Sequence, residues 1–142
     1  MQEQRRYQFQ RSQRLRTRAD FSTVHGARVR ESRGPLTIYA LPNDLGHSRL
    51  GLSVSRSVGT APRRNRIKRL IRESFRLMQH DLPRGYDLFV IVRPHEPLIL
   101  AEYQRILAAA TMRLHAAWQQ QVFAQPHAPP HSEQAKPELQ FV

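Results

Sequence analysis

Basic side chains recur at close spacing between residues 63 and 76, and they are suited to binding an anion. At about 3.6 residues per turn, the segment predicts a helix that ends near His80 and has two different faces. The apolar face comprises Ile67, Leu70, Ile71, Ser74, Phe75 and Met78, and the opposite face comprises Asn65, Lys68, Arg69, Arg72 and Arg76. Only Glu73 interrupts the cations, whereas a face serving solubility alone would mix acids with bases to gain i,i+4 pairs. The segment therefore indicates binding to a polyanion.

Charge is distributed unevenly over the 142 residues. The net charge is +12, and residues 1–76 carry +13 while residues 77–142 carry −1. Of the 23 basic residues only Lys68 and Lys136 are lysines. Arginine meets a phosphate with two parallel hydrogen bonds and also stacks on bases. The first half of the chain therefore indicates a nucleic-acid-binding surface.

Residue types used in catalysis and metal binding are scattered along the chain. The acids of the first 76 residues lie far apart, unlike the carboxylate cluster of a two-metal nuclease. The seven histidines show no ligand spacing, and the sequence contains no cysteine, glycine-rich phosphate loop or nucleophile elbow. We therefore predict no catalytic residue and no metal ligand, which favours a binding protein.

Composition predicts one folded domain with a tail at each end. Residues 1–14 form a basic arm predicted to be flexible, residues 15–122 form the RNA-binding domain, and residues 123–142, with four prolines, form a disordered tail. No apolar run is long enough to span a bilayer, and the basic start lacks the hydrophobic segment of a signal peptide. A cytoplasmic location without membrane contact is expected.

Hydrophobic patterns predict the elements that position the basic helix. Residues 20–25 form a short helix, and residues 35–41 and 49–55 form two strands joined as a hairpin. One face of the second strand carries only glycine and serine, which leaves a floor for a ligand. Residues 86–92 form a strand covered on both faces, and residues 98–122 form a long helix that packs over the sheet.

The second predicted strand and the basic helix together resemble the protein subunit of bacterial ribonuclease P. The resemblance rests on residues 49–56, Arg-Leu-Gly-Leu-Ser-Val-Ser-Arg, followed by residues 64–73, Arg-Asn-Arg-Ile-Lys-Arg-Leu-Ile-Arg-Glu. It extends less densely from about residue 14 to residue 118. It implies an α/β (α+β) two-layer sandwich with a mixed sheet of about four strands flanked by helices, in the order αβββαβα. It also implies a left-handed βαβ crossover through the basic helix.

The resemblance also implies a function in tRNA maturation. The chain is expected to be the non-catalytic protein subunit of an endoribonuclease that removes the 5′ leader from precursor tRNA. Catalysis belongs to the RNA subunit, which holds most of the Mg²⁺. The expected partners are therefore the catalytic RNA and precursor tRNA, with no obligate protein partner.

The family's motif positions imply two groups of RNA-binding residues. The group expected to contact the catalytic RNA consists of Arg56, Arg64, Asn65, Arg66, Lys68, Arg69, Arg72 and Arg76. The group expected to contact the leader consists of Phe21, His25 and Tyr39, whose rings can stack on single-stranded bases. Two positions depart from the family pattern, because His25 replaces a second aromatic and Ser57 replaces a second cation after Arg56. A lower or differently distributed leader affinity is therefore expected.

Other interpretations remain open at the level of sequence. A ribosomal or ribosome-assembly protein without enzymatic role could use the same type of sandwich to bind folded rRNA. Core packing is the alternative role for Phe21 and Tyr39. A basic amphipathic helix could also lie on an anionic membrane, but the apolar face of the segment is needed for the core.

Overall fold

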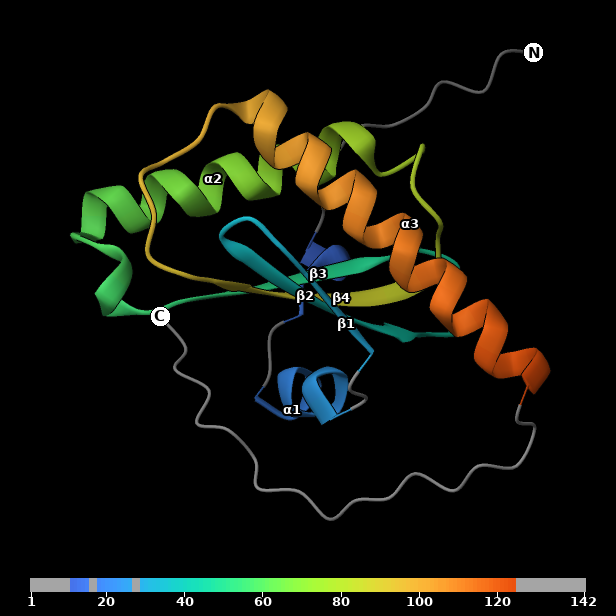
Figure 1. Cartoon of the computed structure of the whole chain (residues 1–142). Helices are drawn as coiled ribbons and strands as arrows, with labels where there is room; N and C mark the ends of the chain where they lie inside the picture. Colours follow the sequence, from blue (N-terminus) through green and yellow to red (C-terminus); the bar gives the residue numbers. More distant parts are fainter. Residues whose placement is uncertain (1–10, 16–17, 27–28, 125–142) are drawn as a thin grey trace.

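The computed structural model describes residues 11–15, 18–26 and 29–124. A four-stranded sheet lies at the centre, with α1 on one face and both α2 and α3 on the other (Figure 1). The elements are η1 (Arg11–Gln13), α1 (Arg18–Gly26), β1 (Arg30–Arg33), β2 (Leu36–Pro42), β3 (Arg49–Val54), η2 (Arg56–Val58), α2 (Ala61–Met78), β4 (Tyr86–Val92) and α3 (Leu100–Ala124). The α-helices and strands follow the expected order αβββαβα.

The strand order of the sheet is β1-β2-β4-β3, so β4 separates β2 from β3. The predicted hairpin between residues 35–41 and 49–55 is therefore wrong. β4 takes the central place because its side chains, apart from Asp87, are apolar on both faces, so two neighbouring strands and two helical layers can cover it. The hairpin partner of β2 is β1, and the turn between them passes through Gly34 at a φ of 53°.

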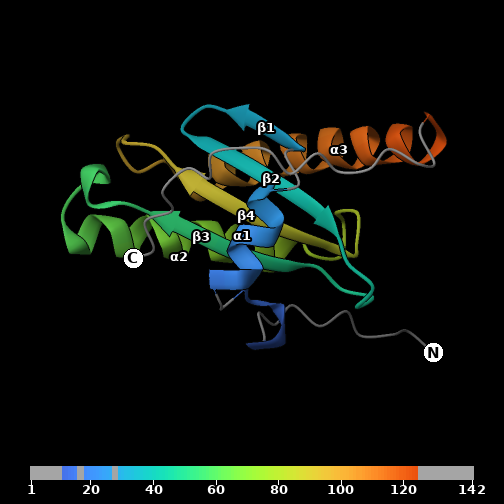
Figure 2. The ribbon, with the colours of Figure 1, turned by 90° about the horizontal axis from the view of Figure 1, so that it is seen from below.

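The connection from β3 through α2 to β4 is left-handed, as the resemblance implies. In Figure 2, with α1 in front of the sheet, the parallel strands β3 and β4 both run to the left and β4 lies above β3. α2 returns to the right behind them. This hand is rare, because strand twist makes most such crossovers right-handed.

The sheet separates two layers of buried side chains. The larger layer lies under α2 and α3, where Ile67, Phe75 and Tyr103 are at most 2% exposed. The predicted core face of the basic helix is confirmed, since its other members are Ile71 and Ser74, which are buried, and Leu70 and Met78, which are partly buried. The smaller layer lies under α1 and consists of Leu15, Val24, Tyr39 and Phe89, with Leu41 and Ile91 packed against them.

The ends of the predicted domain are described only in part. The predicted disordered tail from residue 125 and the first ten residues of the predicted arm lie outside the described residues. Arg14, which belongs to the predicted arm, forms a β-bridge with Leu50, and the Leu15 N–H donates to the Leu50 carbonyl at 3.1 Å. Within the described part of the chain, no helix is both long and apolar enough to cross a membrane.

Candidate RNA-binding surfaces

The turn before α2 sets the direction of the basic helix. Gly59 has a φ of 153°, and a Cβ at this position would lie 2.5 Å from the Cδ atom of Arg63. Only glycine adopts this backbone region without steric strain. Thr60 then caps the helix, because its Oγ1 accepts a hydrogen bond from the Arg63 N–H at 3.4 Å. The Gly59 N–H donates to the Arg56 carbonyl at 3.2 Å, so Arg56 is held beside the start of α2.

The cationic face of α2 points away from the core. We call Arg64, Asn65, Arg66, Lys68, Arg69, Arg72 and Arg76 the cationic stripe. Asn65, Arg66 and Arg69 are exposed, and the other members are half-buried. Arg56 is exposed next to the stripe. The structure therefore places every residue predicted to contact the catalytic RNA on α2 or on η2 just before it, with each side chain exposed or half-buried.

Like charges meet within the stripe. Burial lowers the pKa of Arg72, and the neighbouring Arg14 lowers it further. Burial also lowers the pKa of Lys68, with further contributions from Arg72 and Arg64. Cations drawn together in this way disfavour one another until an anion neutralises them. Within the described residues Arg66, Arg69 and Arg72 form no ion pair with an acid, so the cluster can accept phosphates.

Arg14 was missed by the sequence prediction, which placed it in a flexible arm. It reaches Arg72 because the segment before α1 runs alongside β3. No local pattern in the sequence signals this pairing. The only available signal is the high arginine content of residues 1–18.

Arg76 has an acidic partner, unlike Arg66, Arg69 and Arg72 within the described residues. Its Nε donates to Glu73 Oε2 at 2.9 Å, and its Nη2 donates to Glu73 Oε1. The hydrogen bond lowers the pKa of Glu73 and raises the pKa of Arg76. Arg76 therefore presents less uncompensated charge than Arg69.

Two of the residues predicted to contact the leader, His25 and Tyr39, meet between α1 and the sheet. The His25 ring lies 4.5 Å from the Tyr39 ring and 6.3 Å from the Phe89 ring. Tyr39 is 5% exposed and Phe89 is fully buried. Phe21 lies on α1, but its side chain falls outside the described residues. The structure thus brings His25 and Tyr39 together. Tyr39 packs in the core, which is the alternative to leader binding that the sequence left open.

Arg30 completes this part of the site from β1. Its Nη1 donates to the Tyr39 hydroxyl at 3.2 Å. Burial lowers the pKa of His25, and the positive charge of Arg30 lowers it further. His25 is therefore favoured as a neutral ring that covers Tyr39 and leaves its own half-buried outer side available to a base. The sequence prediction missed Arg30 because β1 has no apolar alternation.

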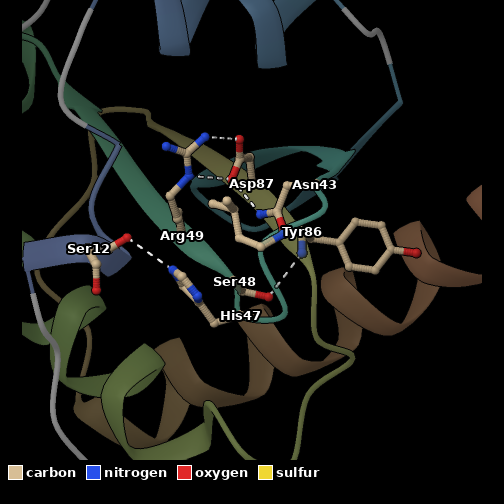
Figure 3. Close-up of polar contacts among 8 residues, drawn as sticks. Ser12, Asn43, His47, Ser48, Arg49, Tyr86 and Asp87 are labelled. Carbon is tan, nitrogen blue, oxygen red and sulfur yellow. Dashed lines mark hydrogen bonds and ion pairs between the residues drawn. The ribbon is translucent and has the colours of Figure 1, made fainter.

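A different arginine closes the end of the same sheet face. Arg49 Nε donates to Asp87 Oδ1 at 2.8 Å, and Arg49 Nη2 donates to Oδ2 at 2.5 Å (Figure 3). Asn43 Nδ2 also donates to Asp87 Oδ1, at 2.7 Å. The hydrogen bonding of Arg49 to the Asp87 carboxylate, which accepts, raises the pKa of Arg49. Because this guanidinium is already paired with a buried carboxylate, Arg49 supports the fold.

The loop before β3 anchors residues 11–14. His47 Nε2 donates to the Ser12 carbonyl at 3.2 Å, and the Ser48 hydroxyl accepts the Tyr86 N–H at 3.2 Å (Figure 3). These contacts connect the β2–β3 loop with η1 and with the start of β4. They help to hold Arg14 near α2.

As for metal binding, no group of three or more His, Asp or Glu side chains suited to hold an ion occurs in the described ranges.

The fold and the cationic stripe define the class of protein. A mixed sheet with a left-handed crossover carries a helix with cations on one side, and the opposite face of the sheet carries packed aromatic rings, as expected of an α+β RNA-binding protein. The family model of ribonuclease P matches residues 9–118. The chain therefore belongs to the ribonuclease P protein family.

Solved structures of bacterial ribonuclease P proteins share this fold. The protein of Staphylococcus aureus is 30% identical, with a TM-score of 0.63, and the match covers 72% of this chain and 94% of that one. The protein of Thermotoga maritima is 26% identical, with a TM-score of 0.54, and the match covers 82% of this chain and 98% of that one. The T. maritima protein in complex with 1-(4-fluorophenyl)-2-thiourea is 27% identical, with a TM-score of 0.54, and covers 78% of this chain and 97% of that one.

Family membership gives the chain its role. It is a protein component of ribonuclease P, it takes part in tRNA processing, and its partner is the RNase P RNA, which carries the catalysis. The ribosomal alternative is thereby set aside. The absence of a predicted catalytic residue agrees with this division of labour between RNA and protein.

Proposed function

We propose that the chain grips the catalytic RNA with Arg56 and the cationic stripe, and binds the 5′ leader of precursor tRNA on the sheet face under α1. The observation that carries the first half is the closeness of Arg14, Arg64, Lys68 and Arg72, because the neighbouring positive charges, together with burial, lower the pKa values of Lys68 and Arg72. Such a cluster suits the closely spaced phosphates of a folded RNA, which it positions without reading sequence.

The leader half of the proposal rests on the aromatic rings under α1. A single-stranded leader exposes its bases, and each base can stack on a flat ring with a gain of roughly 1 to 3 kcal/mol. His25 offers the accessible ring, and Tyr39 supports it from below. Phe21 is included on the basis of the family pattern.

Mg²⁺ enters the proposal as an ion held mainly by the RNA subunit. Cations of the stripe would neutralise some of the phosphates that otherwise require Mg²⁺. The protein is then expected to lower the Mg²⁺ concentration at which the RNA cleaves its substrate. We place this reaction in the cytoplasm, where bacteria make their tRNA precursors.

Reconstitution with the matching transcribed RNA tests the proposal. At low Mg²⁺, addition of the protein should accelerate removal of the 5′ leader, and binding should be tighter for precursor tRNA than for mature tRNA. The matched control is Arg105→Ala, which removes one cation from the exposed surface of α3, far from the stripe in sequence. Leader cleavage that is the same with and without protein would contradict the proposal.

A further inference from the structure

Four polar side chains form a cluster on the sheet face beside His25, at the β1 edge. The register pairs Arg30 with Tyr39 and Ser32 with Thr37 across β1 and β2. Both pairs are hydrogen-bonded, Arg30 Nη1 to the Tyr39 hydroxyl at 3.2 Å and the Ser32 hydroxyl with the Thr37 hydroxyl at 3.0 Å. We call these four residues the β1–β2 cluster. Of these four residues, only Tyr39 belongs to the residues inferred from the family motif.

The cluster lies at the open side of the sheet face. Arg30 and Ser32 are exposed and Thr37 is half-buried, whereas Phe89, the next residue inward from Tyr39, is fully buried. β1 is an edge strand, so no further strand covers it. A strand of RNA that stacks on the outer side of His25 would therefore continue over these side chains and not over the buried aromatic rings.

The chemistry of the cluster matches a sugar–phosphate unit. Arg30 carries the charge and the additional N–H donors that a phosphate needs. A hydrogen-bonded pair of hydroxyls uses one O–H as donor, so the Ser32–Thr37 pair keeps one O–H and several lone pairs for a ligand. A ribose 2′-hydroxyl both donates and accepts, which suits this pair better than a phosphate oxygen that only accepts.

We propose that the β1–β2 cluster binds one nucleotide of the leader, with its phosphate on Arg30 and its 2′-hydroxyl on the Ser32–Thr37 pair. The protein would then distinguish an RNA leader from a DNA leader at one position. This inference rests on the proposed leader-binding function and adds the chemical group that is recognised.

A cycle of one protein variant and one substrate variant tests the inference. Thr37→Val keeps the shape and the strand preference of the side chain and removes only its hydroxyl. Affinity of the reconstituted holoenzyme is measured for precursor tRNAs in which single leader nucleotides are 2′-deoxy. With the unmodified protein, one position should lose about 2- to 10-fold in affinity on deoxy substitution, as expected for one hydrogen bond. With Thr37→Val, the loss at that position should shrink toward onefold.

Two further variants sharpen the test. Ser12→Ala removes an exposed hydroxyl outside the cluster and leaves the main-chain carbonyl of residue 12, which accepts from His47, in place. The deoxy effect should therefore persist in full. Arg30→Gln should lower the slope of log K against log salt concentration for precursor binding by up to about one, as expected for the loss of one phosphate contact. Binding of mature tRNA should not change.

The possible outcomes distinguish a failure of this inference from a failure of the proposed leader-binding function. If precursor and mature tRNA bind the unmodified holoenzyme equally, the proposed leader function itself fails. If the leader adds affinity but Thr37→Val weakens ribose and deoxyribose leaders by the same factor, the leader function stands and the β1–β2 cluster does not bind a 2′-hydroxyl.

Discussion

Arginine serves opposite purposes at the sheet end and on α2. Arg49 at the sheet end meets the buried carboxylate of Asp87 through two hydrogen bonds. Arg72 on α2 is half-buried among other cations and has no acidic partner within the described residues. The difference shows that the charge of an arginine does not indicate its role until its neighbours are known. Where an acid is built in, the arginine stabilises the fold, and where only cations gather, the anion must come from a ligand.

The largest expected effect concerns the paired arginine. Asp87→Asn leaves the half-buried Arg49 without its carboxylate and should lower the free energy of unfolding by up to about 3 kcal/mol. Denaturant titration measures this loss. Glu96→Gln is the matched control, because it breaks the exposed pair with Arg63 and should cost less than about 0.5 kcal/mol. Equal losses for both variants would contradict the distinction between an ion pair with a buried carboxylate and an exposed ion pair.

The next effect concerns the unpaired arginine. Arg72→Ala should weaken binding to the catalytic RNA by about 10- to 100-fold and lower the salt slope by about one, because one charge-assisted phosphate contact is lost. The free energy of unfolding should not fall, since repulsion with Arg14 is relieved. Arg105→Ala removes the same charge on α3 and should leave the affinity nearly unchanged. A loss of the same size for Arg105→Ala would mean that only the net charge matters.

A smaller effect distinguishes two members of the stripe. Arg69→Ala should weaken RNA binding more than Arg76→Ala, because Glu73 already offsets the charge of Arg76. The difference in affinity should be small, because exposed ion pairs contribute little. Titration of labelled RNA at fixed salt measures it. A larger loss for Arg76→Ala would show that RNA binding displaces Glu73 from the pair.

The smallest effect is a pH dependence from His25. Its pKa is lowered in the folded protein from the ordinary value of 6.5, so the unfolded chain takes up the proton first as the pH falls. Above that value both states are neutral at this ring and it contributes no pH dependence. Below it, the stability of the fold should decrease, and His25→Gln should remove part of that decrease. Identical pH profiles for the two proteins would place the titration elsewhere.

Local pattern was sufficient for the helices and for the central strand. The two faces of α2 follow from apolar spacing alone, and the run of β4, apolar except for Asp87, indicated a strand covered on both sides. The residues of the cationic stripe were therefore predictable, because their common surface is a property of one helix. The family resemblance added the left-handed crossover, which no periodicity contains.

Pairing between distant segments was not predictable in this way. The hairpin prediction was wrong because strands adjacent in sequence usually pair, and nothing local shows that β4 inserts between them. β1 was missed since its sequence, Arg-Glu-Ser-Arg, lacks the apolar alternation of a half-buried strand. Arg14 was missed because it reaches its site through a pairing with the distant strand β3, and Arg30 was missed together with β1, the strand that carries it.

Tethered cleavage of RNA tests most directly whether the two surfaces hold two different RNAs. The chain has no cysteine, so a single cysteine introduced by Arg69→Cys or by Ser32→Cys can carry one iron chelate that cuts nearby RNA. Both positions are exposed. In the reconstituted complex with precursor tRNA, the probe at position 69 should cut the catalytic RNA and the probe at position 32 should cut the leader. Cuts from both positions in the same molecule would contradict the assignment of the stripe to one RNA and the sheet face to the other.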